Sequence, residues 1–148
     1  AHVWWTLALC DEVFIPRMGT MGSIGARGRH QSIHEALVKE GVAVTYFSDP
    51  PDKVALAPDL PLSPVGAERA MRDIRFMADA FRAAVCAGPV GQRHGLTPEG
   101  LIALGADMLT GQAAVDAGLA DGVATYEDVA AYALKLAEDK ATSQAAST

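Results

Sequence analysis

The chain is poor in cysteine and in basic charge. Its 148 residues include two cysteines, Cys10 and Cys86, which are too few for a disulfide framework and lie in apolar surroundings typical of buried, reduced thiols. Lysine and arginine number 12 against 18 aspartates and glutamates, which gives a net charge of −6. Because binding to phosphate needs a basic surface, we expect no nucleic-acid partner. Reduced thiols also suit a cytoplasmic protein.

Long apolar runs are missing as well. Residues 1–10 are apolar, but a helix that spans a bilayer needs about 20 such residues. They also lack the positive leading region and the cleavage site of a signal peptide. Since Val-Trp-Trp would make an unusual exposed start, we expect the chain to begin inside a domain, and a membrane anchor before it is left open. With 50% hydrophobic and 20% charged residues, the composition suits one domain with a buried core.

The patterns of metal, phosphate and several enzyme sites are absent too. His30 and His34 are four residues apart and could share a zinc ion, but no third ligand is evident, which favours a surface pair. Glycines recur at positions 19, 22, 25 and 28 without forming a G-x-G-x-x-G fingerprint or a P-loop. The elbow serine of a hydrolase triad and the paired carboxylates of a glycosidase are also missing. We therefore expect no metal and no cofactor.

Helical and strand patterns alternate along the chain, which favours an α/β fold. Capping residues and apolar periodicity predict helices over residues 1–9, 32–40, 64–87, a short stretch that opens at Thr97-Pro98, 111–118 and 126–138. Strands are predicted over residues 12–16, 42–47 and 119–123, with loops over 19–28 and 48–64. The small, polar residues 139–148 are expected to be disordered.

A serine and a lysine are the candidates for chemistry. Ser23 lies in a glycine-bracketed turn, and Lys53 follows thirty residues later, ahead of the apolar residues 54–57. Burial penalises the charged form of an amine, and a neutral lysine held by a hydroxyl can act as a general base. The alternative is a surface lysine and an ordinary glycine turn. Spacing alone favours that alternative.

The residues around this pair form an ordered set of motifs. The set comprises Trp4-Trp5, Cys-Asp-Glu-Val at 10–13, Met-Gly-Ser-Ile-Gly at 21–25, Lys53, Leu-Thr-Gly-Gln-Ala-Ala at 109–114 and Gly-Leu-Ala-Asp at 118–121. Their order and spacing resemble the signal peptide peptidase A family of serine peptidases. The resemblance is closest to the phage and prophage branch, whose head-maturation proteases digest capsid scaffold. It extends from Ala1 to about Leu134.

The resemblance implies a Ser/Lys dyad with one member replaced. Lys53 matches the general base and Ser23 the serine that orients it, while the nucleophile position falls on Ala1. The backbone amide of His2, with Gly22, would contribute to the substrate and oxyanion site. Alanine has no hydroxyl, so the chain as given is expected to be inactive, through deliberate inactivation, natural loss or a displaced fragment start. A second departure is Asp-Pro-Pro-Asp at 49–52, where relatives carry a glycine-containing loop.

The resemblance also implies a fold and partners. The fold would be of the Clp protease/crotonase type, with residues 1–138 as the C-terminal part of a catalytic domain that lacks the early β-α repeats. A missing part or a second subunit in a homo-oligomer would complete the sheet. Substrates would be peptides or proteins, either scaffold protein or signal peptides, in the cytoplasm of a bacterial host or a phage prohead. A crotonase-type acyl-CoA enzyme fits less well, because its oxyanion hole uses no lysine. The alternative is a non-catalytic homologue that acts as an oligomeric binding or assembly protein.

Overall fold

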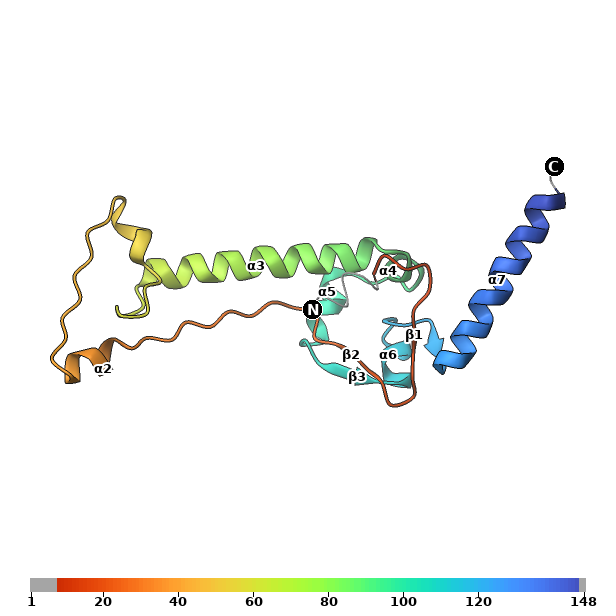
Figure 1. Ribbon diagram of the computed structural model, residues 1–148, viewed down its shortest axis with the longest axis horizontal. Helices are drawn as coiled ribbons and strands as arrows, with labels where there is room; N and C mark the ends of the chain where they lie inside the picture. Colours follow the sequence, from red (N-terminus) through yellow and green to blue (C-terminus); the bar gives the residue numbers. More distant parts are fainter. Residues whose placement is uncertain (1–7, 147–148) are drawn as a thin grey trace. The chain divides into compact units, whose positions relative to one another are not determined.

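The computed structural model describes residues 8–146, so the helix expected over residues 1–9 falls almost wholly outside the described part. The chain divides into two compact units. The first unit holds the residues up to Ile24 together with those from Phe81 onward, and the second unit holds Gly25–Ala80. Helices and strands are mixed, in agreement with the expected α/β class (Figure 1). Among the described helices, none is long and apolar enough to cross a bilayer.

The second unit contains helix α2 (His34–Lys39), the 3-10 helix η1 (Pro51–Val54) and the first part of α3 (Pro64–Ala87). Helix α2 begins two residues later than predicted. The Ser32 hydroxyl donates to the Leu60 carbonyl over 3.1 Å, and Ile33 takes the N-cap position. The end of the helix at Gly41 was predicted, and this glycine adopts φ +75°.

The strand predicted over residues 42–47 is wrong for this structure. The segment is assigned to no strand, and among the described residues no other strand pairs with it. Its β-branched and aromatic side chains have a β-propensity that depends on packing against a neighbouring strand. That packing is missing here, since Phe47 is 95% exposed. Tyr46 is anchored by its hydroxyl, which lies 2.7 and 2.8 Å from the carboxylate oxygens of Asp59.

Helix α3 has the bounds that the apolar stripe and Pro64 predict. The hydroxyl of Ser63 accepts a hydrogen bond from the Gly66 amide over 3.0 Å, which satisfies one of the amides that a helix start leaves unpaired. The predicted stripe is buried only toward its C-terminal end. Phe81 and Val85 belong to the core of the first unit, whereas Met71 is about half exposed.

The first unit is built on two pairs of short strands. Strand β1 (Phe14–Ile15) pairs in parallel with β4 (Gly122–Val123), and β2 (Thr20–Gly22) pairs antiparallel with β3 (Met108–Thr110), as Figure 1 shows for β2 and β3. The strands predicted near residues 12–16 and 119–123 are confirmed, although shorter. Strand β2 corrects the loop predicted over residues 19–28. Three residues are too few to show an alternating pattern.

Among the described residues, the first unit also holds the end of α3 and the helices α4 (Pro89–Arg93), α5 (Pro98–Ala103), α6 (Gln112–Asp116) and α7 (Tyr126–Ala146). The predicted cap of α5 is confirmed, because the Thr97 hydroxyl accepts from the Gly100 amide over 3.1 Å. Thr125 and Asp128 cap α7 reciprocally. Helix α7 continues to Ala146, beyond the end near Glu138 that the sequence predicts. Alanine favours the helix there, and the Thr142 hydroxyl bonds the Glu138 carbonyl.

Helix α6 ends in a motif that fixes the chain before β4. The amide of Gly118 donates to the Val115 carbonyl, and the amide of Leu119 donates to the Ala114 carbonyl. These two bonds form a Schellman motif, which needs a left-handed residue; Gly118 has φ +73°. A Cβ at this glycine would lie 2.9 Å from the Cβ of His94. Position 118 therefore needs glycine for its backbone conformation and for its packing.

We predict that Gly118→Ala destabilises the protein more than Gly95→Ala. Both glycines follow a helix with left-handed φ, so alanine costs about 1–2 kcal/mol at either site. Around Gly95, however, nothing lies within 4 Å of the added Cβ. Gly118→Ala should cost at least about 1 kcal/mol more, through its collision with His94. Urea unfolding of the two variants measures the difference, and equal losses would contradict the packing argument.

Candidate functional site

The turn after β2 is held by a close approach of two backbones. Gly22 has φ +140°, and a Cβ on it would lie 2.0 Å from the Asp107 carbonyl oxygen. The amide of Ser23 donates to the same oxygen over 3.0 Å. Position 22 therefore accepts only glycine. Gly22, which the resemblance assigns to the substrate site, is therefore held in place by its contact with the backbone of Asp107.

Ser23 adopts a conformation that serine rarely takes. Its φ is +53°, in the left-handed region where a non-glycine residue costs about 1–2 kcal/mol. Such a conformation persists only where the surroundings hold it, and it concentrates at functional sites. Met21 and Ile24 on either side are buried, while the Ser23 side chain is exposed. The turn thus presents the Ser23 hydroxyl to solvent from a rigid backbone.

Lys53 lies in η1 of the second unit, and its side chain is exposed. The neighbouring Asp52 forms an ion pair with Arg69 of α3 at 3.3 Å, and Arg69 also donates to the Asp52 carbonyl over 2.7 Å. These contacts fix η1 to α3. The apolar run after Lys53 does not bury the lysine within this unit, which corrects the expectation that residues 54–57 would do so. Leu56 in that run is itself 45% exposed.

The described structure places the predicted dyad residues in different units. Ser23 and Gly22 belong to the first unit and Lys53 to the second. The pairing of Ser23 with Lys53 therefore stays a prediction. Ala1 and His2 lie outside the described residues, so their predicted roles as nucleophile position and oxyanion amide stay predictions as well.

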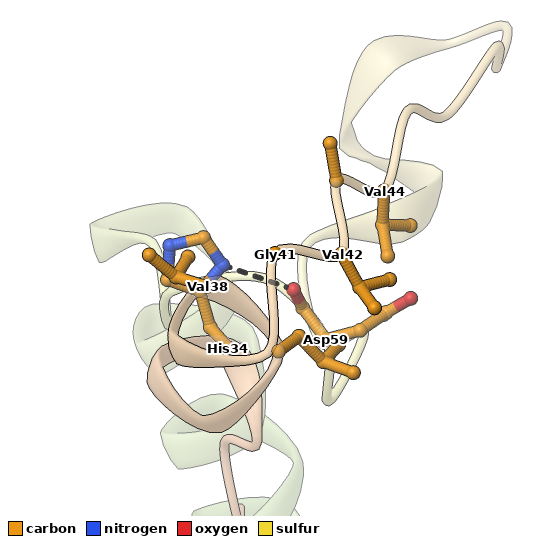
Figure 2. Close-up of a pocket in the computed structure, with 8 residues that line it drawn as sticks. His34, Val38, Gly41, Val42, Val44 and Asp59 are labelled. Carbon is orange, nitrogen blue, oxygen red and sulfur yellow. Dashed lines mark hydrogen bonds between the residues drawn. The ribbon is translucent and has the colours of Figure 1, made fainter.

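An apolar pocket of about 340 Å³ lies in the second unit, between the end of α2 and the segment that follows it (Figure 2). It is lined by His34, Leu37, Val38, Gly41, Val42, Ala43, Val44 and Asp59. The His34 ring nitrogen Nδ1 lies 3.2 Å from the Asp59 carbonyl oxygen, as the dashed line in Figure 2 marks. Neither Ser23 nor Lys53 lines this pocket. Within residues 8–146, no group of three or more possible ligands could hold a metal ion.

The sequence reasoning missed a charged cluster around Asp121 in the first unit. The carboxylate accepts the Val13 amide over 2.7 Å through Oδ2. Its Oδ1 accepts a hydrogen bond from Arg93 and lies 2.9 Å from His94 Nε2. Arg93 also donates to the Asp11 carbonyl. We call these residues, with the Asp11 and Val13 backbone, the Asp121 cluster.

The cluster keeps Asp121 ionised although its side chain is only 12% exposed. Burial opposes the charge, but the hydrogen bonds from the Val13 amide, Arg93 and His94 outweigh it, and the pKa of Asp121 falls below the ordinary aspartate value. Asp121 closes the Gly-Leu-Ala-Asp motif at 118–121, which was a signal for its importance. Nothing in the sequence marked Arg93 as its partner.

The family comparison agrees with the resemblance in its broad terms. The model of peptidase family S49 matches residues 4–140, which is nearly the whole chain. The match includes both turn residues at 22–23, Lys53 and Asp121. Among curated proteins, none matches the chain at a significant level.

We predict that Asp121→Asn weakens the fold mainly above pH 4. The unfolded aspartate titrates near pH 3.9 and the folded one lower, so ionised Asp121 stabilises the fold above the unfolded pKa. This contribution is lost as the pH falls through the folded pKa. At pH 7 the variant should lose about 1–3 kcal/mol of unfolding free energy, and the loss should shrink below pH 4. Denaturant titrations at several pH values measure it.

The matched control for this experiment is Asp116→Asn, which removes an exposed carboxylate from α6 outside the cluster. A loss for Asp121→Asn that stays constant from pH 7 to pH 2 would contradict the electrostatic explanation.

A second prediction concerns the strain at Ser23. Glycine adopts φ +53° without steric cost, so Ser23→Gly should raise the unfolding free energy by up to about 1 kcal/mol. Ser23→Ala removes the same hydroxyl but keeps a Cβ in the left-handed region, and should bring no gain. Thermal unfolding of the two variants separates strain from side-chain chemistry. If both variants shift the unfolding free energy equally, the turn is not strained.

Proposed function

Because the chain belongs to peptidase family S49, a family of serine peptidases, we propose that it is an endopeptidase subunit built on a Ser/Lys dyad. The observation that carries the proposal is the left-handed Ser23, which costs stability and exposes a hydroxyl on a turn that Gly22 and Asp107 hold fixed. The hydroxyl is suited to hold the amine of a lysine in place.

In the proposed reaction, a serine hydroxyl at position 1 attacks the carbonyl carbon of the scissile peptide bond. The neutral amine of Lys53 takes the hydroxyl proton and later gives it to the leaving amine, so that an acyl-enzyme forms and the peptide bond breaks. Water then hydrolyses the acyl-enzyme by the same proton route. The His2 amide and the Gly22 backbone would stabilise the oxyanion. Ser23 orients Lys53 throughout.

Ala1 removes the first step from this scheme. Without a hydroxyl at position 1 no acyl-enzyme can form, so the chain as given is proposed to be inactive. The same residue supports the second candidate function, a non-catalytic homologue that serves as an oligomeric binding or assembly protein. The retained Ser23 and Lys53 favour the peptidase, because a binding protein has no need of a lysine base and a strained serine.

The proposed fold is of the Clp protease/crotonase type, completed by further polypeptide and by assembly into a homo-oligomer. Exposed apolar side chains in the second unit support this assembly: Phe76 is 74% exposed, and Met71 and Met77 are half exposed on the same helix. The proposed substrates are capsid scaffold protein or signal peptides. The proposed setting is the cytoplasm of a bacterial host or a phage prohead.

We predict that the full-length protein does not react with a fluorophosphonate probe, whereas its Ala1→Ser variant does. In that background, Lys53→Ala should lower the labelling rate by about 10² or more, because proton transfer to a positioned base contributes 10²–10⁴-fold. Ser23→Ala should lower it less. Labelling is read by mass spectrometry of the intact protein, which also counts the modified sites.

Lys39→Ala is the matched control, since Lys39 is another exposed lysine of the second unit, in the last turn of α2. It should leave the labelling rate unchanged. A folded Ala1→Ser protein that stays inert toward the probe and toward a casein substrate would contradict the peptidase proposal. The assembly function would then be favoured.

A further inference from the structure

We propose that Asp121 is a positioning residue for the peptidase reaction, and that it acts through the segment at residues 8–13. The inference rests on the proposed function, in which position 1 carries the nucleophile and residues 8–13 come later in the same stretch of chain. Asp121 itself would touch neither the substrate nor the reacting atoms. Its carboxylate holds the Val13 amide and, through Arg93, the Asp11 carbonyl, in the stretch of chain that comes after the attacking group.

The first part of the argument is the pairing of Asp121 with Val13. The Val13 amide donates to Oδ2 of Asp121 over 2.7 Å, and the Asp121 amide donates to the Val13 carbonyl over 2.7 Å. The backbone bond already continues the β1–β4 pairing. The carboxylate adds a hydrogen bond to the amide of the same residue. This bond is charge-assisted, and such bonds are stronger than neutral ones. Val13, which is 3% exposed, is thus held on both its amide and its carbonyl.

The second part is the bridge that Arg93 makes. Arg93 at the end of α4 donates to Oδ1 of Asp121 and to the carbonyl of Asp11. Asp11 precedes the strand and is exposed, and the bond from Arg93 is what joins its backbone to the cluster. His94 lies 2.9 Å from the same Oδ1 and shares the carboxylate. Losing the Asp121 charge would release Arg93, and with it the Asp11 carbonyl.

The third part is that the segment is anchored again at the other end of α4. Ala8 is buried, and its carbonyl oxygen lies 1.8 Å from the place where a Cβ on Gly88, the N-cap of α4, would stand. Residues 8–13 therefore contact this short helix near both of its ends. A displacement of about 1 Å of a reacting group can cost about 10²-fold in rate. Loosening one anchor should therefore slow the chemical step more than it weakens substrate binding.

The test uses the full-length protein with Ala1→Ser and compares Asp121→Asn with Asp116→Asn in that background. We expect Asp121→Asn to lower kcat for peptide cleavage by about 10-fold or more, with KM changed less than about 2-fold. Asp116→Asn should leave both constants unchanged. Circular dichroism at the assay temperature ensures that only folded variants are compared. An unchanged kcat, or a rise in KM that accounts for the whole loss, would overturn the proposal.

A second measurement does not depend on activity and uses the protein without Ala1→Ser. Cys10 directly precedes Asp11 and is half-buried, so its rate of alkylation by iodoacetamide reports how firmly the segment is held. Asp121→Asn should raise this rate by about 5-fold or more, while Cys86 in α3 keeps its rate as an internal reference. If the Ala1→Ser protein cleaves no peptide but Asp121→Asn still raises the alkylation rate of Cys10, the proposed function fails and the anchoring of residues 8–13 by Asp121 stands. A Cys10 rate that does not respond overturns the positioning role.

Discussion

The carboxylate of Asp121 is the contact on which the first unit depends. It accepts hydrogen bonds from the amide of Val13, the guanidinium of Arg93 and the ring of His94. These bonds join three segments of the chain that are far apart in the sequence. β1 and β4 contribute only two residues each, so their backbone pairing alone is a small interaction. A charged acceptor with three donors supplies the specificity that such short strands lack. Helix α7 packs against the same region, where Tyr132 bonds Glu12 over 3.0 Å and meets Phe14 edge-to-face at 5.9 Å.

Close approaches of backbone explain why glycines recur in the motifs. Gly22 and Gly118 each face an atom that a Cβ would strike, and each has positive φ. One leads into the left-handed Ser23, and the other brings the chain to Asp121. The two motifs that carry the family resemblance thus have a common physical basis. In both, a glycine allows a turn that brings a polar side chain to a fixed place, Ser23 to the exposed surface and Asp121 to a partly buried position.

The parts of the fold that the sequence predicted are those set by local chemistry. Thr97-Pro98 and Thr125 start helices because their hydroxyls cap the first turn, and Gly41 ends one because it accepts left-handed φ. Pro64 and the apolar stripe defined α3. Strands β2 and β3 escaped prediction because three residues show no periodicity, and their pairing joins residues 20–22 to 108–110. Lys53 and Ser23 were chosen as candidates because of the resemblance. The ion pair of Asp52 with Arg69 could not be predicted, because it is a tertiary contact that no local pattern encodes. The same holds for the bond from Arg93 to the Asp11 carbonyl.

The segment at residues 42–47 shows how a local preference can remain unrealised. Its valines, tyrosine and phenylalanine prefer a pleated surface, and yet among the described residues no strand offers them one. Tyr46 instead uses its hydroxyl to bond Asp59, and this hydrogen bond raises the pKa of Tyr46 above its ordinary value. Phe47 has no polar group that could form such a bond, and it stays almost fully exposed. The same unit also exposes Phe76 and Met77 on α3. Exposed apolar side chains that lie together are typical of surfaces that other polypeptide covers, which is why we include assembly in the proposed function.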